Sequence, residues 1–108
     1  MIQVVNRRTY HGASVYIGRP TALGNPFVIG KDGTRDEVLK KYRRGLWRAM
    51  QSGNERVMAE LKRLATMASE SDLILSCWCA PEPCHGEIIR AAIEYLRGQA
   101  EATITLSK

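Results

Sequence analysis

Apolar residues near the start of the chain are spaced as in β-strands. "IQVV" at residues 2–5 is a β-branched run and predicts a first strand, and "SVYIG" at residues 14–18 predicts a second. Between them the polar segment 6–13 contains a glycine and predicts a loop. "DLILSCW" at residues 72–78 is a compact apolar run after a polar break, and it predicts a buried strand.

Other apolar residues recur at the spacing of helices. "TRDE" at residues 34–37 fits a capping box, and apolar positions follow at helical spacing from Val38 to Met50. "SGN" at residues 52–54 ends this helix, and a second is expected from about Asn54 to Ala68. A third has an apolar face from Ile88 to Leu96, and Gly98 is expected to end it. "ATITL" at residues 102–106 is expected to form a last edge strand.

The segment between the second strand and the first helix is not regular. Residues 19–33 contain two prolines and three glycines, so they predict a long ordered loop with a brief extended piece at residues 27–29. The order of elements predicts an α/β fold: a single layered domain over residues 1–108, with a short central sheet packed by about three helices. A chain of 108 residues buries roughly two-thirds of its unfolded surface, which suits one modest core.

Composition narrows the class of protein. No apolar run approaches the ~18 residues that a membrane helix needs, and the first residues lack the pattern of a secretion signal, so we expect a cytoplasmic protein without a membrane partner. The formal charge of +5 and the pI of about 9.4 favour anionic partners such as nucleotides or nucleic acid. The sequence leaves the oligomeric state open. Basic residues of the first helix would either contact phosphates or form a solvated face: Lys40, Lys41, Arg43, Arg44 and Arg48.

The segment "CWCAPEPCHGE" at residues 77–87 concentrates reactive side chains, including all three cysteines. If the strand before it continues, Cys77 and Cys79 point to one face and Trp78 to the other. The chain then leaves the strand near Ala80, "PEP" forms a turn, and His85 arrives as the third helix opens. In open α/β sheets, ligands bind where strands end and helices begin. We therefore expect a ligand site here.

The start of the third helix would carry a partial positive charge. Its first N–H groups lack helical partners, so they would bind an anion or stabilise a thiolate on Cys84 and lower its pKa. Gly86 would let a ligand approach the backbone. Cys84, with His85 and Glu87, would then supply catalytic chemistry on a nucleoside or nucleotide derivative, while Glu87 would otherwise only complement the helix dipole. Whether the chain is an enzyme stays open.

A metal site is the alternative use of the same residues. Cys77, Cys79, Cys84 and His85 supply the four ligands of a tetrahedral zinc site. Most structural zinc sites use two ligand pairs separated by a longer loop, whereas these four are local. No cofactor is therefore favoured. A non-enzymatic, zinc-stabilised module that binds protein or nucleic acid remains the alternative function.

"GRPTALGNPF" at residues 18–27 is the second unusual segment. Arg19 follows a strand end and could grip a phosphate bidentately. Gly24 would allow a backbone conformation that other residues avoid, and Asn25 would orient the ligand or hold the loop by turn chemistry. The predicted ligand-binding residues from both segments are Gly18, Arg19, Gly24, Asn25, Cys79 and Gly86.

These two segments resemble a family of small bacterial and phage proteins, domain of unknown function 4326. Its members share an "IGR…GNPF" segment, a "GTR" helix start and a "CWC.P..CHG" motif followed by an acidic residue, which is usually Asp and is Glu87 here. The resemblance covers residues 15–96. It marks Gly18, Arg19, Gly24, Asn25, Pro26, Phe27, Cys77, Trp78, Cys79, Pro81, Cys84, His85 and Gly86.

The resemblance implies a shared site more than a reaction. A phage setting would place the protein in the host cytoplasm, with a role in nucleotide chemistry, DNA modification or counter-defence. Our leading hypothesis is a pocket between residues 18–27 and the start of the third helix that binds, and in one version processes, a nucleotide-like or phosphate-bearing small molecule. This hypothesis requires Arg19 and Cys84 to face the same cavity.

Overall fold

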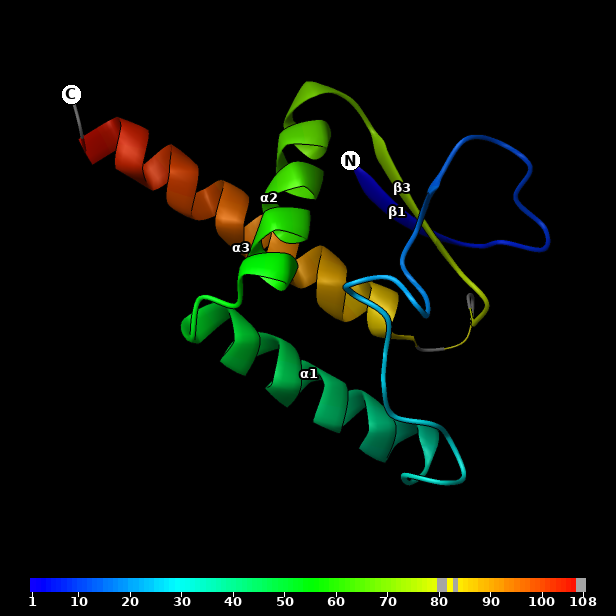
Figure 1. Cartoon of the computed structure of the whole chain (residues 1–108). Helices are drawn as coiled ribbons and strands as arrows, with labels where there is room; N and C mark the ends of the chain where they lie inside the picture. Colours follow the sequence, from blue (N-terminus) through cyan, green and yellow to red (C-terminus); the bar gives the residue numbers. More distant parts are fainter. Residues whose placement is uncertain (80–81, 83, 107–108) are drawn as a thin grey trace.

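The computed structural model confirms the α/β class (Figure 1). It describes residues 1–79, 82 and 84–106, with side chains described as far as residue 99. The elements in chain order are β1 (Ile2–Asn6), β2 (Val15–Tyr16), α1 (Arg35–Gln51), α2 (Glu55–Glu70), β3 (Leu73–Cys77) and α3 (His85–Leu106). Pro81 and most of the predicted turn at residues 80–83 lie outside the described residues.

The three strands form a parallel sheet in the order β1-β3-β2. β1 pairs with β3 along its whole length, from Ile2 opposite Leu73 to Asn6 opposite Cys77. β2 is shorter and pairs only with Leu75 and Ser76. All three strands therefore end at the same edge of the sheet, which is where ligands bind in parallel sheets.

The predicted helix boundaries in the middle of the chain are confirmed. α1 begins with a capping box, in which the Glu37 N–H donates to Thr34 Oγ1 at 3.3 Å and the Thr34 N–H donates to Glu37 Oε1 at 3.0 Å. These bonds lower the pKa of Glu37, because they favour its ionised form. α1 ends at the cap Ser52, and Asn54 caps α2 by accepting from the Val57 N–H at 3.1 Å.

The core lies between the sheet and the helices. α2 and α3 pack against each other and both contact β3, while α1 packs on α2 and α3. This arrangement puts the start of α3 beside the ends of the strands and the start of α1 close by (Figure 1). The largest fully buried side chains include the apolar residues Ile17, Leu23, Val38, Leu61, Leu64, Leu75, Ile89 and Ile93.

The predictions for the end of the chain are wrong. The edge strand expected at residues 102–106 does not form, because α3 continues through Gly98 to Leu106. A glycine inside a helix costs only about 1 kcal/mol, and the helix formers "QAEA" follow it immediately. Residues 19–33 form a loop outside the sheet, as predicted, and a turn follows Val28, whose carbonyl accepts from the N–H groups of Lys31 and Asp32. Within the described residues, none of the helices is long and apolar enough to cross a membrane.

Candidate functional site

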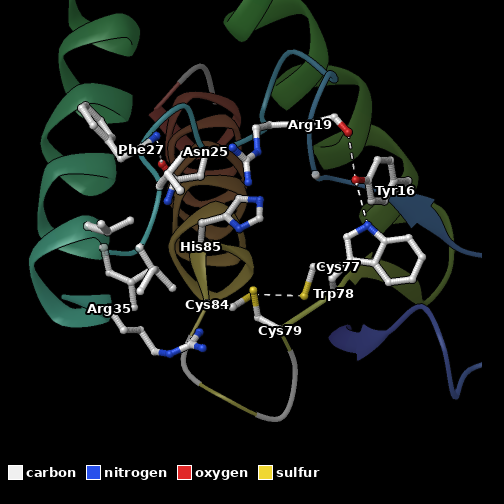
Figure 2. A pocket seen from close by; sticks show the side chains of 15 residues that line it. Tyr16, Arg19, Asn25, Phe27, Arg35, Cys77, Trp78, Cys79, Cys84 and His85 are labelled. Carbon is white, nitrogen blue, oxygen red and sulfur yellow. Dashed lines mark hydrogen bonds between the residues drawn. The ribbon is translucent and has the colours of Figure 1, made fainter. Parts of the chain in front are cut away.

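A pocket of about 480 Å³ opens at the edge where the strands end. Figure 2 shows Arg19 on one side of it and Cys84 on the other, so the two segments singled out in the sequence share a cavity. The lining side chains come from five parts of the chain: Tyr16, Gly18, Arg19, Asn25, Phe27, Val28, Ile29, Arg35, Val38, Leu39, Cys77, Trp78, Cys79, Cys84 and His85. Gly24, Gly86 and Glu87 were also predicted for the site, but they are not among these residues.

The pocket is lined by positive and aromatic groups. It contains the guanidinium groups of Arg19 and Arg35, and none of its described lining residues is an aspartate or glutamate. Sequence reasoning missed Arg35. The position of Arg35 in the sequence could have indicated it, because Arg35 is the first residue of α1 and directly follows the cap residue Thr34. A helix start that faces a ligand loop is a place to look for such a residue.

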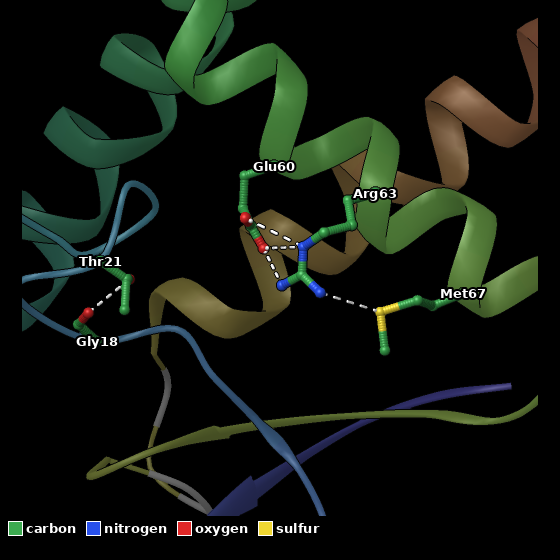
Figure 3. Close-up of polar contacts among 5 residues, drawn as sticks. All are labelled: Gly18, Thr21, Glu60, Arg63 and Met67. Carbon is green, nitrogen blue, oxygen red and sulfur yellow. Dashed lines mark hydrogen bonds and ion pairs between the residues drawn. The ribbon is translucent and has the colours of Figure 1, made fainter.

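The segment before α1 is held in a compact turn by its own hydrogen bonds. The N–H and Oγ1 of Thr21 donate to the Gly18 carbonyl at 2.9 and 2.6 Å (Figure 3), and the Gly24 N–H donates to the Thr21 carbonyl at 3.0 Å. A Cβ atom on Gly24 would lie 2.8 Å from the backbone nitrogen of Arg19. Gly24 does not have a positive φ, so the predicted unusual conformation is wrong. Its role is to let two backbone segments touch.

Asn25 holds the turn before Phe27 and also lines the pocket. Its Oδ1 accepts a hydrogen bond from the Phe27 N–H at 2.9 Å, which is the expected turn chemistry. Asn25 also lines the pocket (Figure 2). Because the oxygen holds the turn, the side chain can serve a ligand mainly as a donor, through its amide nitrogen.

His85 is buried and fixed in orientation. Its Nε2 lies 2.8 Å from the Ile17 carbonyl oxygen, and its ring meets the Tyr42 ring edge-on at 5.2 Å. Since a carbonyl can only accept, Nε2 must carry the proton. In the neutral ring Nδ1 is then left as an acceptor. His85 thus ties α3 to the end of β2 and can offer one acceptor to the pocket.

Cys84 acts as the N-cap of α3. Its Sγ accepts from the Gly86 N–H at 3.2 Å and lies 3.1 Å from the Sγ of Cys77. The predicted lowering of its pKa is wrong. The hydrogen bond with Cys77 and the burial of the thiol raise the pKa of Cys84, and they outweigh the opposing effect of the Gly86 N–H. Cys84 is therefore a protonated thiol at neutral pH.

Two of the first N–H groups of α3 are already engaged within the chain. The N–H groups of Gly86 and Glu87 donate to Sγ and the carbonyl of Cys84, at 3.2 and 3.3 Å. A Cβ on Gly86 would lie 2.6 Å from Val4 Cγ1, so this glycine serves the packing of α3 on the sheet rather than the approach of a ligand. Arg19 and Arg35 are the two arginines among the described residues that line the pocket.

Glu87 shares a hollow with Cys84 but lies outside the pocket that holds His85. Its carboxylate is exposed and lies 3.4 Å from the Arg90 guanidinium. This second hollow, of about 290 Å³, is lined by Glu87 and Cys84 together with Asp36 and Lys40. The structure thus places Glu87 where it complements the helix dipole, and outside the pocket that holds His85.

The zinc alternative gains no support from the geometry. Within the part of the chain that the structure describes, no three His, Cys, Asp or Glu side chains form a group that could hold a metal ion. Nε2 of His85 is engaged by the Ile17 carbonyl, and Cys84 caps a helix. These two bonds do not exclude zinc, because Nδ1 of His85 stays an acceptor and a thiolate sulfur can accept an N–H bond while it binds a metal.

Trp78 and Cys79 follow the end of β3 rather than extend it. The strand ends at Cys77, so the alternation of faces stops there, and Trp78 lines the same pocket as Cys79 instead of the opposite face. The Trp78 Nε1–H donates to the Tyr16 hydroxyl at 3.1 Å, which itself donates to the Arg19 carbonyl at 2.9 Å (Figure 2). Cys79 is half-buried, whereas Cys77 and Cys84 are buried.

Comparison with known proteins identifies relatives of this chain. The family called Domain of unknown function (DUF4326) matches residues 3–95. An uncharacterized 12.4 kDa protein in the nrdA-td intergenic region of Enterobacteria phage T4 is similar, with 36% identity over 83 residues. That alignment covers 76% of this chain and 68% of the phage protein. No solved structure matches.

Proposed function

Since the chain belongs to the DUF4326 family, whose match spans all the residues that line the pocket, we propose that this pocket binds a nucleotide-like, phosphate-bearing small molecule. One observation carries the proposal. Two guanidinium groups, from Arg19 and Arg35, face a cavity without a carboxylate among its described lining residues. A cavity with this charge favours an anion, and guanidinium groups match the geometry of phosphate oxygens.

The size and surface of the pocket favour a ligand larger than phosphate alone. Its volume of about 480 Å³ falls within the roughly 300–1,000 Å³ of small-molecule sites. Tyr16, Phe27 and Trp78 contribute aromatic rings to the lining. A ligand that carries a planar ring beside its phosphate would use both kinds of surface.

The polar side chains support distinct roles. Arg19 takes part in no side-chain hydrogen bond or ion pair with the described residues, so its guanidinium is available to the phosphate. The amide nitrogen of Asn25 would donate to an acceptor of the ligand, and Nδ1 of His85 would accept from a hydroxyl or ring N–H. Together they would fix the orientation of the ligand.

The proposal is confined to binding. A thiol reaction at Cys84 would need the thiolate, and the raised pKa of Cys84 keeps the thiol protonated. Its Sγ is also occupied as the cap of α3. The hypothesis that Cys84, His85 and Glu87 are catalytic therefore has weaker support than a binding role for the pocket.

Calorimetric titration with ADP and with pyrophosphate tests the proposal. Arg19→Ala should weaken binding by about tenfold or more, which is the effect of losing a hydrogen bond to a charged group. Arg44→Ala removes an equal charge from an exposed position of α1 outside the pocket, so it should leave the affinity almost unchanged. Failure of both ligands to bind, or equal losses in the two variants, would overturn the proposal.

A further inference from the structure

We propose that a surface next to the pocket stacks an unpaired base of single-stranded nucleic acid. This surface, the stacking platform, consists of Arg7, Arg8, Tyr16 and Trp78. The inference rests on the proposed function and deepens it, because it names the class of ligand. One nucleotide of the strand would place its phosphate in the pocket, and a neighbouring base would lie on Trp78.

Trp78 is an exposed aromatic ring in a fixed position. Its side chain is 52% exposed, although indole is a side chain that proteins usually bury. The Nε1–H bond to the Tyr16 hydroxyl, at 3.1 Å, fixes the ring, and the two rings meet edge-on with centroids 6.3 Å apart. An exposed and preorganised ring can stack a base without paying entropy to become ordered.

The backbone beneath the platform is also held in place. The Asn6 amide nitrogen donates to the Trp78 carbonyl at 3.2 Å, and its Oδ1 accepts from the Arg8 N–H at 2.8 Å. The Arg7 N–H donates to the Cys77 carbonyl at 2.8 Å. The loop after β1 and the residues after β3 therefore form one supported surface, from two parts of the chain about 70 residues apart.

The cations of the platform are available to phosphate. The Arg7 guanidinium carbon lies 4.5 Å from the centre of the Tyr16 ring and 5.8 Å from that of Trp78, and Arg8 lies 5.9 Å from Trp78. Neither arginine belongs to an ion pair of the described residues. Arg63, by contrast, is engaged by the Glu60 carboxylate and the Met67 sulfur (Figure 3).

The platform continues into the pocket, because Tyr16 and Trp78 also line it (Figure 2). Arg7 and Arg8 flank these rings from outside the pocket, and Arg19 and Arg35 lie inside it. A free nucleotide brings its phosphates to one place, whereas a strand brings a phosphate to either side of each base. Positive groups on both sides of an exposed ring therefore match a nucleic-acid strand better than they match a free nucleotide.

The test is fluorescence anisotropy with a labelled oligothymidylate of about ten nucleotides, a length that spans a typical single-strand site. Trp78→Ala should weaken binding by about tenfold or more, and Trp78→Phe should restore part of the loss because a ring remains. The pair Arg7→Ala and Arg8→Ala should reduce the slope of log affinity against log salt by about 0.7 for each lost phosphate contact.

A matched control separates the platform from general charge. The pair Arg44→Ala and Arg48→Ala removes two exposed charges from α1, and it should weaken binding less than the Arg7 and Arg8 pair. Circular dichroism of every variant establishes that it is folded. Equal losses in the two arginine pairs, with no effect of Trp78→Ala, would overturn the inference by showing a non-specific basic surface.

Failure of this inference can be told apart from failure of the proposed function. If ADP binds in an Arg19-dependent way while the oligonucleotide binds no more tightly than ADP, the pocket proposal stands and the strand proposal is wrong. If the oligonucleotide competes with ADP and depends on both Trp78 and Arg19, both stand. If neither ligand binds, both are wrong.

Discussion

The chemistry of Cys84 is decided by what touches its sulfur. Cys77 and burial raise the pKa of the thiol, while the Gly86 N–H acts in the opposite direction. A cysteine at a helix start would by itself suggest an activated thiolate. Here the sulfur is a structural acceptor instead. Cys79, which is half-buried and lines the pocket, is the more accessible thiol.

This difference predicts an order of alkylation in the native protein. Iodoacetamide should modify Cys79 first, and it should modify Cys84 only when the protein unfolds. Because the pKa of Cys84 is raised, only a small fraction of this side chain is thiolate. Its rate of alkylation should therefore stay low between about pH 7 and pH 9. Peptide mapping by mass spectrometry measures both rates.

The variant Cys79→Ser is the control for the alkylation experiment, because it removes the accessible thiol and should leave the native protein largely unmodified. Rapid modification of Cys84 in that folded variant would contradict the assignment. It would also return Cys84 to the role of a reactive nucleophile.

At the scale of single residues, the sequence predicts which side chains line the pocket better than it predicts their chemical roles there. Arg19, Asn25, Cys79, Cys84 and His85 all line the pocket, because the ends of parallel strands meet at one edge. The direction of the pKa shift at Cys84 could not be predicted. It depends on the 3.1 Å contact with Cys77, and spacing along the chain does not give that distance.

At the scale of elements, Gly86 determines how closely α3 approaches the sheet. Gly86→Ala should lower the free energy of unfolding by about 1–3 kcal/mol, since the new Cβ would lie 2.6 Å from Val4 Cγ1 and overpack the interface. Urea denaturation followed by circular dichroism measures the change. The second variant Val4→Ala should recover part of the loss in a Gly86→Ala background, because it removes the clashing methyl group.

Gly98 offers a matched control in the same helix. A Cβ there would meet nothing within 4 Å, so Gly98→Ala should stabilise the protein by about 0.5–1 kcal/mol through helix propensity. Equal effects of the two substitutions would show that Gly86 is not a packing contact. A destabilised Gly98→Ala variant would contradict the helical course of residues 99–106.

Elements whose signals are local were predicted well. The capping box at Thr34, the break at residues 52–54 and the apolar period of α2 all depend on residues a few positions apart. The end of α3 was misjudged, because Gly98 is a weak stop signal when helix-forming residues follow it. The end of β3 at Cys77 was misjudged too, since its pairing with β1 and β2 decides where the strand stops.

At the scale of the whole molecule, the pocket depends on contacts between distant segments. Residues 17–34 form no strand or helix of their own, and they form one wall of the pocket. Tyr42 of α1 anchors this wall, because its hydroxyl donates to the Leu23 carbonyl at 2.6 Å. His85 of α3 anchors it through the Ile17 carbonyl at 2.8 Å. The wall is thus held from both helices that border the site.

Tyr42→Phe tests this anchoring, because it removes one hydroxyl and keeps the ring. Burial raises the pKa of Tyr42, so the hydroxyl is a protonated donor at every pH at which the protein is studied. Its loss leaves the Leu23 carbonyl buried without its donor, and the free energy of unfolding should fall by about 1–3 kcal/mol. Binding of pyrophosphate should weaken as well, since the wall that carries Arg19 would be ordered only on binding.

The control for Tyr42→Phe is Tyr95→Phe, which removes a hydroxyl from a residue that is 48% exposed and lies outside the pocket. It should change the free energy of unfolding by less than about 0.5 kcal/mol, as expected of a surface substitution, and leave binding unaltered. If Tyr42→Phe lowers stability without weakening the binding of pyrophosphate, the pocket wall keeps its shape without α1. The coupling between the core and the site would then have to run through other contacts of the wall, such as the His85 bond to the Ile17 carbonyl and the Tyr16 bond to the Arg19 carbonyl.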